Sequence, residues 1–357
     1  MLRTAVIGAG TMGRLYARAF HDSDVSELVS VVDIDTDRAR VAASEFSEVT
    51  AYNSTAEMLA ADNIDAAAVS LPDYAHRDTV VALLDAGVPV LCEKPLATTL
   101  EDCADIVASA AHSGMLMVNY GNRHRPEALA LRDVVRSGSL GQLQSITMKG
   151  NEKLAKTRQL AWRDRTDPTW FLISHLVDFV SWLTGERFSD VCGLAHGGQG
   201  ATPLSDEIGP LPLQTGHTYI ASLDSGTAVT LSANWALPAG APAAGDMAIE
   251  IIGSKGYAKV DFMERPVVVY GERADHLGWD LARPDYSGRS RGWWITSCDY
   301  FLDCVANRRR PEPSAEDGAE TSLVLLAMHD SLDSGVRVRL DPIRASFAEL
   351  IEKRASA

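Results

Sequence analysis

Short apolar runs and helical patterns alternate through the first third of the chain. Runs rich in apolar residues predict strands at 5–7, 28–32, 66–70, 89–92 and 116–118, and apolar residues at helical spacing predict helices at 13–20, 37–46, 75–86 and 100–113. Strands that alternate with helices of this length are typical of βαβ units and a parallel sheet. Because the strands are apolar on both faces, we expect helices on both sides of the sheet.

The pattern changes after about residue 122. Helices are predicted at 126–137, 168–184, 295–306 and 315–334, and strands at 144–149, 218–223, 228–233, 248–252, 257–261 and 266–270. Turn-like connections at 224–226 and 253–256 predict antiparallel hairpins. We therefore predict an α/β protein with a doubly wound parallel sheet over 1–122, an α+β domain with a large, mostly antiparallel open sheet over 123–340, and a C-terminal helix or tail over 341–357.

Composition narrows the class of protein. A chain of 357 residues fits about two domains, and its formal net charge of −15 opposes binding to nucleic acid. The five cysteines form no CxxC pair, which favours a reducing compartment and argues against a structural zinc or any other metal site. No run of 18 apolar residues is present, so we expect no membrane span and a cytoplasmic protein.

A glycine-rich motif follows the first predicted strand and opens the first predicted helix. In this context a GxGxxG pattern is the Rossmann fingerprint: its glycines permit a tight turn, close approach of the backbone to a pyrophosphate, and close helix packing. The helix N-terminus adds free N–H groups and a positive dipole. We assign the cofactor contacts of this loop to Gly8, Gly10, Thr11, Met12 and Gly13.

The residues that end the second predicted strand favour NAD as the cofactor. Asp33 lies 20 residues after Gly13, where a carboxylate accepts hydrogen bonds from the adenosine ribose and repels a 2′-phosphate. Ile34 offers no compensating cation, whereas Arg38 is a candidate for one. NADP is therefore the less favoured cofactor, and FAD or a purely structural turn are minor alternatives.

The tripeptide Glu93-Lys94-Pro95 carries the candidate chemistry. It lies at the carboxyl end of a predicted parallel strand, the edge of an open α/β sheet at which ligands bind. A desolvated lysine there can approach neutrality and exchange a proton with a substrate. A cis peptide bond before Pro95 would direct the Lys94 side chain. A surface lysine in a turn is the alternative.

The helix predicted at 168–184 holds a second titratable pair. Phe171, His175, Asp178 and Trp182 share one face of it. A histidine and a carboxylate on an apolar face must be paired or functional. His175 is accordingly a candidate proton shuttle oriented by Asp178, with a hydrogen-bonded core histidine as the alternative.

The whole pattern resembles the Gfo/Idh/MocA oxidoreductases, which include inositol and sugar dehydrogenases. The pieces that carry the resemblance are the glycine loop, Leu71-Pro72 with His76, Glu93-Lys94-Pro95, the helix with His175 and Asp178, and the turn at 253–256. The resemblance implies reversible hydride transfer between NAD(P) and a hydroxyl-bearing carbon of a sugar or polyol, and a homodimer or homotetramer.

It also implies roles for single residues. Lys94 and His175 act in proton transfer, with Asp178 beside them; Lys94, Asn122, Arg123, Phe171 and His175 meet the substrate; and Leu71, Pro72, His76, Glu93 and Lys94 meet the cofactor. Lys153, Arg163, Arg165 and several tryptophans (Trp162, Trp170, Trp279, Trp293 and Trp294) are weaker candidates, for which solvation and packing are the commoner roles.

Two positions depart from the family pattern. Many dehydrogenases of this family have an aspartate four residues before the helical histidine, where this chain has Phe171, and a glycine where it has Ile173. The departure weakens an inositol-type specificity and favours a divergent subgroup or a less polar pocket. A non-catalytic NAD-binding regulator and an NAD-assisted glycosidase therefore remain alternatives.

Overall fold

The computed structural model describes all residues except 114, 155–159, 161, 198–214, 239, 242–244, 264–266, 271–273, 278–282, 286, 288 and 356–357. The chain forms two compact units, each assembled from separate segments. The first, called here the N-terminal unit, comprises Met1–His124, Trp279–Ser322 and Phe347–Ala357; the second unit comprises Arg125–Gly278 and Leu323–Ser346. These discontinuous units do not coincide with the continuous segments 123–340 and 341–357 expected from the sequence.

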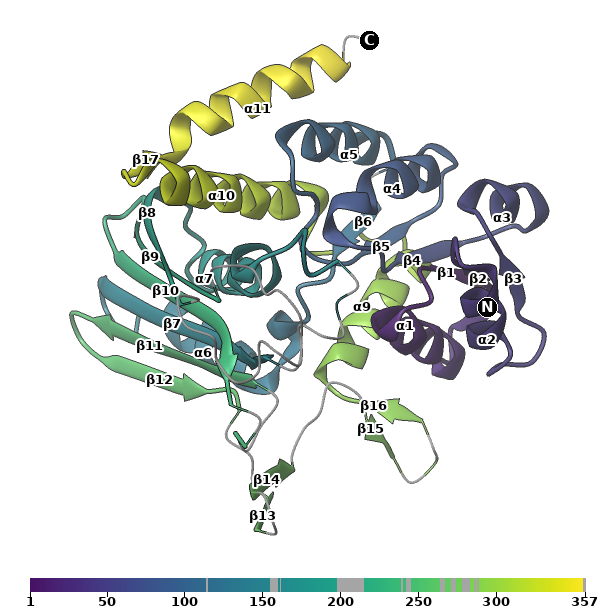
Figure 1. Ribbon diagram of the computed structural model, residues 1–357, viewed down its shortest axis with the longest axis horizontal. Coiled ribbons are helices and arrows are strands. Elements are labelled where there is room, and N and C mark those ends of the chain that lie inside the picture. The colour runs from purple at the N-terminus through teal and green to yellow at the C-terminus, as the bar shows by residue number, and fades with distance from the viewer. Residues whose placement is uncertain are drawn as a thin grey trace. The chain divides into compact units, whose positions relative to one another are not determined.

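The N-terminal unit contains a six-stranded parallel sheet of order β3-β2-β1-β4-β5-β6 (Figure 1). This is the predicted doubly wound sheet, with β3 as a strand in addition to the five predicted. Its strands are β1 Leu2–Ile7, β2 Ser26–Val32, β3 Thr50–Tyr52, β4 Ala66–Val69, β5 Val90–Cys92 and β6 Leu116–Val118.

Helices bury both faces of this sheet, as the strand composition predicts. One apolar cluster joins the sheet to α4 (His76–Asp85) and α5 (Leu100–Ser113), and the other joins it to α1 (Thr11–Asp22), α2 (Thr36–Ala43) and α9 (Trp293–Ala306). The helix α3 (Thr55–Ala61) and the short turns η1 (Asp73–Ala75) and η2 (Gly121–His124) complete the part of this unit before residue 125. The helix predicted at 295–306 thus packs in the N-terminal unit.

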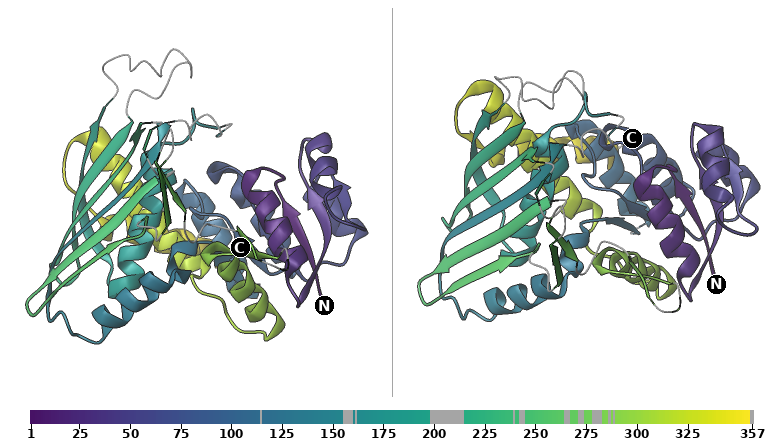
Figure 2. Two further views of the ribbon diagram at one scale, coloured as in Figure 1. Left: turned by 90° about the horizontal axis from the view of Figure 1, so that it is seen from below. Right: turned by 60° about the horizontal axis from the view of Figure 1, so that its bottom comes forward.

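The second unit is built on a seven-stranded mixed sheet of order β12-β11-β7-β10-β9-β8-β17, whose strands lie side by side in both views of Figure 2. Only the β7–β10 pair is parallel among the described strand pairs of this sheet, so the predicted, mostly antiparallel sheet is confirmed. Its strands are β7 Leu143–Lys153, β8 Phe188–His196, β9 Gly216–Leu223, β10 Ala228–Leu237, β11 Gly245–Gly253, β12 Tyr257–Asp261 and β17 Val338–Arg339.

Both predicted hairpins are present, as β9–β10 and β11–β12. The strand predicted at 266–270 does not join the large sheet: β13 (Val267–Tyr270) pairs with β14 (Ala274–Leu277), and a further short pair is β15 (Arg283–Pro284) with β16 (Ser290–Arg291). One face of the large sheet packs on α6 (Pro126–Arg136), α7 (Ser174–Thr184) and α10 (Ala315–Ser334). The chain ends with α11 (Leu340–Ala355).

The helix predicted at 168–184 is capped at both ends. The Asp167 carboxylate accepts hydrogen bonds from the N–H groups of Thr169 (2.7 Å) and Trp170 (3.1 Å), and Gly185 ends the helix with a φ of +75°. The first turn, η4 (Thr169–Ile173), is π-helical and leads directly into α7. No helix of the described residues is long and apolar enough to cross a membrane.

Candidate functional site

The carboxyl end of β1 leads into a glycine turn that only glycine can form. Gly8 has a φ of +95°, and a Cβ there would lie 2.2 Å from the carbonyl oxygen of Ser70. A Cβ on Gly13 would lie 1.7 Å from the carbonyl oxygen of Gly8, so α1 packs closely against the turn. A Cβ on Gly10, by contrast, would meet no heavy atom within 4 Å. Open space therefore adjoins the start of the helix.

This open space suits an anion. Gly10 is the N-cap of α1 and brings no side chain to bond the first N–H groups; Thr11 is exposed and Met12 is half-buried. The first N–H groups of a helix lack intrahelical acceptors and lie at the positive end of its dipole. The glycine loop therefore fits the pyrophosphate of a dinucleotide, the group for which the sequence predicts it.

Asp33 lies at the next strand end and is buried, with 7% of its surface exposed. Its carboxylate accepts hydrogen bonds from the N–H groups of Ala9 (2.8 Å) and Asp35 (2.9 Å), which ties the end of β2 to the glycine turn. Ile34 is 93% exposed, and Nη1 of Arg38 lies 3.5 Å from Oδ2 of Asp33. The predicted acid is therefore fixed in place, with one cation beside it.

The loop after β4 carries three further predicted cofactor contacts, Leu71, Pro72 and His76. Leu71 and Pro72 are half-buried, and a Cβ on Gly8 would come within 3.2 Å of the Leu71 side chain, so Leu71 adjoins the glycine turn. His76 is fully buried; Nδ1 lies 3.0 Å from the carbonyl oxygen of Pro95, and Nε2 lies 3.0 Å from that of Leu71. The imidazole thus connects two loops, a structural role that the motif alone does not reveal.

Glu93 and Lys94 lie at the carboxyl end of β5. The peptide bond between Lys94 and Pro95 is cis, as anticipated. One oxygen of the Glu93 carboxylate accepts a hydrogen bond from the Tyr16 hydroxyl (2.6 Å), and the other accepts one from the Lys94 N–H (3.2 Å). The sequence predicts that Glu93 contacts the cofactor. In the structure, both oxygens of its carboxylate accept hydrogen bonds from the protein.

The segment after β6 is the turn η2. Asn122 is buried in it, and Arg123 is half-buried. Burial, followed by the charge of Arg123, lowers the pKa of His124 to about 4, so this imidazole is neutral near pH 7. A Cβ on Gly121 would lie 2.8 Å from Trp293, because the turn packs closely on the start of α9.

The other predicted site residues belong to the second unit. On the 168–184 helix, Asp178 is buried, whereas His175 and Phe171 are half-buried. The Phe171 ring contacts the buried Trp235 edge to face, with 5.8 Å between ring centroids. An aromatic pair therefore occupies the place where the family pattern leads one to expect a carboxylate.

A polar cluster that the sequence did not reveal surrounds the start of this helix. Oδ2 of Asp167 lies 2.7 Å from Nε2 of His329, whose Nδ1 faces the carbonyl oxygen of Leu325 at 2.8 Å. Both ring nitrogens therefore face acceptors, and hydrogen bonding to Asp167 raises the pKa of His329 against the opposing effect of burial. The Trp170 ring stacks on the His329 ring at 4.7 Å.

The same cluster continues into the sheet. Oγ1 of Thr169 lies 2.7 Å from Nδ1 of His217 and 2.6 Å from the Tyr219 hydroxyl, and all three residues are buried. Burial lowers the pKa of His217 and raises that of Tyr219, so both are neutral near pH 7. The side chains that pair across this cluster are 48 to 162 residues apart in the sequence. Local sequence patterns therefore do not predict these pairs.

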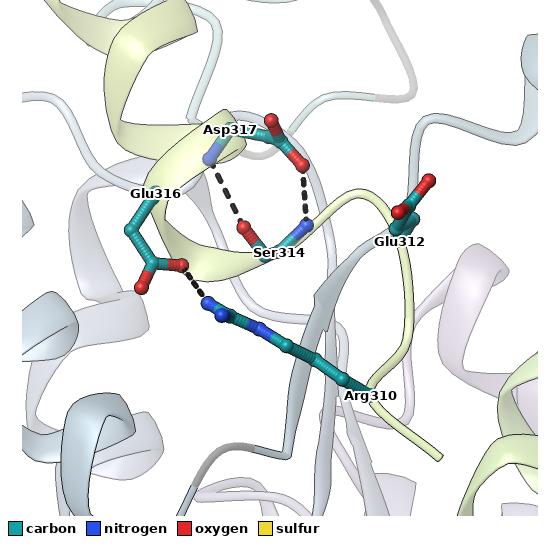
Figure 3. Close-up of a pocket in the computed structure, with 5 residues that line it drawn as sticks. All are labelled: Arg310, Glu312, Ser314, Glu316 and Asp317. Carbon is teal, nitrogen blue, oxygen red and sulfur yellow. Dashed lines mark hydrogen bonds and ion pairs between the residues drawn. The ribbon is translucent and has the colours of Figure 1, made fainter.

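A pocket elsewhere on the N-terminal unit is lined by Arg310, Glu312, Ser314, Glu316 and Asp317 (Figure 3). Ser314 and Asp317 form a reciprocal capping box: the Asp317 carboxylate accepts from the Ser314 N–H (2.9 Å), and the Ser314 hydroxyl accepts from the Asp317 N–H (3.3 Å). Arg310 pairs with Glu316. These two pairs explain how α10 begins and do not indicate a ligand.

The weaker candidates divide between the two units. Trp170 and Trp294 are buried packing residues, Lys153 and Arg163 are half-buried, and Arg165 is exposed; Trp279 lies outside the described residues. Within the described part of the chain, no group of three or more His, Cys, Asp or Glu side chains is placed to hold a metal ion, and the five cysteines are free thiols.

A parallel sheet with this glycine turn and acid is typical of a dinucleotide-binding Rossmann unit, and family comparisons agree. Residues 2–120 match the oxidoreductase family with an NAD-binding Rossmann fold, and residues 128–259 match the GFO/IDH/MocA C-terminal domain. The chain belongs to the Gfo/Idh/MocA family.

Its relatives include sugar and inositol dehydrogenases. Myo-inositol dehydrogenase Hyg17 of Streptomyces leeuwenhoekii is 32% identical over 71% of this chain and 75% of the relative. D-apiose dehydrogenase of Paraburkholderia graminis is 25% identical over 96% and 90%, respectively. The scyllo-inositol dehydrogenase of Lactobacillus casei, solved with NAD(H) and scyllo-inositol, has the same fold, with a TM-score of 0.80 at 18% identity over 95% of this chain and 99% of that structure.

The two glycines at the start of α1 should respond differently to substitution. We expect Gly13→Ala to destabilise the protein by about 3 kcal/mol, because its Cβ would collide with the Gly8 carbonyl. Gly10→Ala should change stability by less than about 0.5 kcal/mol, because its Cβ would meet open space. Denaturant unfolding of both variants tests this, and equal losses would contradict the described turn.

The Asp167–His329 pair should make stability depend on pH. Because the pKa of His329 is raised in the folded state, its protonated form stabilises the protein. This contribution is fully present below pH 6.5 and is lost as the pH rises through the folded-state pKa of His329. The lowered pKa of Asp167 contributes stability that is present above 3.8 and is lost as pH falls through its folded-state value. The contribution of the pair to the free energy of unfolding is therefore largest between about pH 4 and pH 6.5.

We expect His329→Gln to cost about 1–2 kcal/mol in that window and progressively less at alkaline pH. His112→Gln is the matched control, since Nδ1 of His112 also faces a carbonyl one helical turn earlier (2.9 Å) and no carboxylate pairs with it among the described contacts. Urea unfolding across pH measures both. A loss for His329→Gln that does not vary with pH would show that the ion pair contributes nothing.

Proposed function

We propose that the protein is an NAD-dependent dehydrogenase that transfers a hydride between the nicotinamide and a hydroxyl-bearing carbon of a sugar, polyol or related compound. The single observation that carries this proposal is the convergence of three groups at the carboxyl edge of one sheet. The glycine turn follows β1, Asp33 follows β2 and Lys94 follows β5. Open α/β sheets bind ligands at this edge.

When bound, the nicotinamide supplies hydride acceptance and donation. Gly8, Gly10 and the first turn of α1 would hold the pyrophosphate, and Asp33 the adenosine ribose. Lys94 is the proposed group that takes the hydroxyl proton, and its backbone N–H donates a hydrogen bond to the Glu93 carboxylate (3.2 Å). His175 and Asp178 are proposed as a second proton-transfer pair, and Asn122, Arg123 and Phe171 as substrate contacts.

The substrate class follows from the relatives together with Phe171. Inositol and apiose dehydrogenases are among the relatives, so a polyhydroxylated carbon compound is proposed. The pair of Phe171 with Trp235 supports a substrate with an apolar stretch, because an aromatic edge offers no hydrogen bond to a hydroxyl. A homodimer or homotetramer in the cytoplasm remains the proposed state.

Replacing Lys94 tests the proton-transfer role. We expect Lys94→Met to lower kcat by about 100-fold or more while the affinity for NADH changes by less than about threefold, because general base catalysis supplies a factor of this size. Lys259→Met is the control, since Lys259 is an exposed lysine of β12 that pairs with Glu250 of β11. The assay follows absorbance of the reduced nicotinamide over a panel of sugars, polyols and their acids. Full turnover by Lys94→Met on the same substrate would exclude this role.

Asp33 should determine the preference for NAD. Asp33→Asn removes the charge while its amide oxygen can still accept the Ala9 N–H, so we expect the discrimination against NADP to fall by about tenfold or more. Asp35→Asn is the control, since Asp35 is a nearby, more exposed carboxylate that caps α2. Fluorescence titration with both reduced cofactors measures the ratio. An unchanged ratio would assign the selectivity to another residue.

A further inference from the structure

A continuous chain of buried hydrogen bonds ends on the Glu93 carboxylate. Its members come from four separate elements: Tyr16 from α1, Glu93 after β5, Asn119 after β6, and Ser297 from α9. Tyr16 and Ser297 have no exposed surface, and Asn119 has 2%. All four belong to the N-terminal unit.

Two of the donors in this chain run toward the carboxylate. The Ser297 hydroxyl lies 2.7 Å from the carbonyl oxygen of Trp294 and 2.9 Å from the amide oxygen of Asn119, and the Asn119 amide donates to the Tyr16 oxygen at 2.6 Å. The single Tyr16 proton is then available for Glu93, whose Oε1 lies 2.6 Å away. Glu93 accepts at both oxygens, because the Lys94 N–H reaches the other one at 3.2 Å.

The tyrosine in this chain is a donor and not a proton acceptor. Burial, and then the nearby charge of Glu93, hold the pKa of Tyr16 well above its ordinary value. Its ring packs on Trp294 with 4.5 Å between centroids, so the hydroxyl has a fixed direction. A hydroxyl that stays protonated and immobile can orient a carboxylate, but it cannot exchange protons with a substrate.

We propose that Tyr16 is a positioning residue for Lys94, acting through the Glu93 carboxylate and itself held by Asn119 and Ser297. This inference rests on the proposed function for the role of Lys94. The backbone supports it, because the Glu93 N–H donates to Val69 (2.9 Å) and the Asn119 N–H to Cys92 (2.7 Å), which fixes both strand ends between which the chain runs. The carboxylate is thereby held one residue from the proposed proton acceptor.

Tyr16→Phe removes only the hydroxyl and keeps the ring against Trp294. Hydrogen bonds to a charged group are strong, so we expect kcat to fall by about 10- to 100-fold, with the KM for NAD changed by less than about threefold and the pH at half-maximal kcat shifted. Ser297→Ala acts two bonds further from the carboxylate, and we expect a smaller loss in the same direction. Tyr300→Phe is the matched control, because the Tyr300 hydroxyl accepts the Glu312 N–H (3.3 Å) and hydrogen-bonds with the Cys304 thiol, and neither partner belongs to the chain that ends on Glu93.

A second readout needs no substrate. The rate at which acetic anhydride acetylates Lys94, measured by mass spectrometry across pH without NAD, reports the environment of its amine directly. We expect the pH dependence of this rate to change in Tyr16→Phe and, less, in Ser297→Ala, and to match the wild type in Tyr300→Phe. Thermal unfolding and NADH binding confirm that the variants are folded; if Tyr16→Phe does not fold, Ser297→Ala decides.

The two readouts separate the possible failures. A changed acetylation profile in a protein that oxidises no compound of the panel would support the positioning role and contradict the dehydrogenase proposal. Wild-type acetylation and wild-type kcat in both folded variants would overturn the positioning role and leave the dehydrogenase proposal standing. A loss of kcat with an unchanged acetylation profile would also overturn it, because Tyr16 would then act by a route other than Lys94.

Discussion

The contact between Gly13 and the Gly8 carbonyl is the constraint on which the N-terminal unit depends. Because no Cβ fits there, α1 can start directly against the carboxyl edge of β1. That placement directs the uncapped N–H groups of the helix toward open space, and it also places Tyr16, one turn later, beside the end of β5. One steric relation between two glycines therefore governs both the uncapped start of the helix and the hydrogen bonds that reach Glu93.

Local sequence patterns predict most of the first 120 residues, because neighbouring residues determine most of the strands and helices in this part of the chain. Strand composition, helical spacing and the glycine motif predict five of the six strands of the parallel sheet, but they do not predict β3 or α3. The sequence predicts the helix at 295–306. Its place in the N-terminal unit depends on distant partners: Ser297 of this helix contacts Asn119, which is 178 residues away in the sequence. The strand β8 was missed, and β13 was assigned to the wrong sheet, because strand pairing is decided by distant segments.

Two motif residues, His76 and Glu93, form hydrogen bonds that stabilise the loops at the strand ends. His76 and Glu93 were both expected to meet the cofactor, yet His76 faces backbone carbonyls with each ring nitrogen, and Glu93 accepts from a tyrosine and a backbone N–H. A buried polar side chain costs free energy unless it is hydrogen-bonded. At a strand end, such a side chain can therefore serve the geometry of the edge without touching a ligand, and only the three-dimensional partners distinguish these roles.

The net negative charge of the chain is compensated locally at this edge of the sheet. A net charge of −15 would repel a dinucleotide if the carboxylates nearest to it were uncompensated. Asp33 and Glu93 are instead held by backbone N–H groups, and Glu93 by the Tyr16 hydroxyl as well, so their charge is stabilised by fixed donors. The uncapped start of α1 keeps its N–H groups and its dipole for an anion. At this edge, fixed hydrogen-bond donors and the helix dipole therefore offset the net negative charge of the chain.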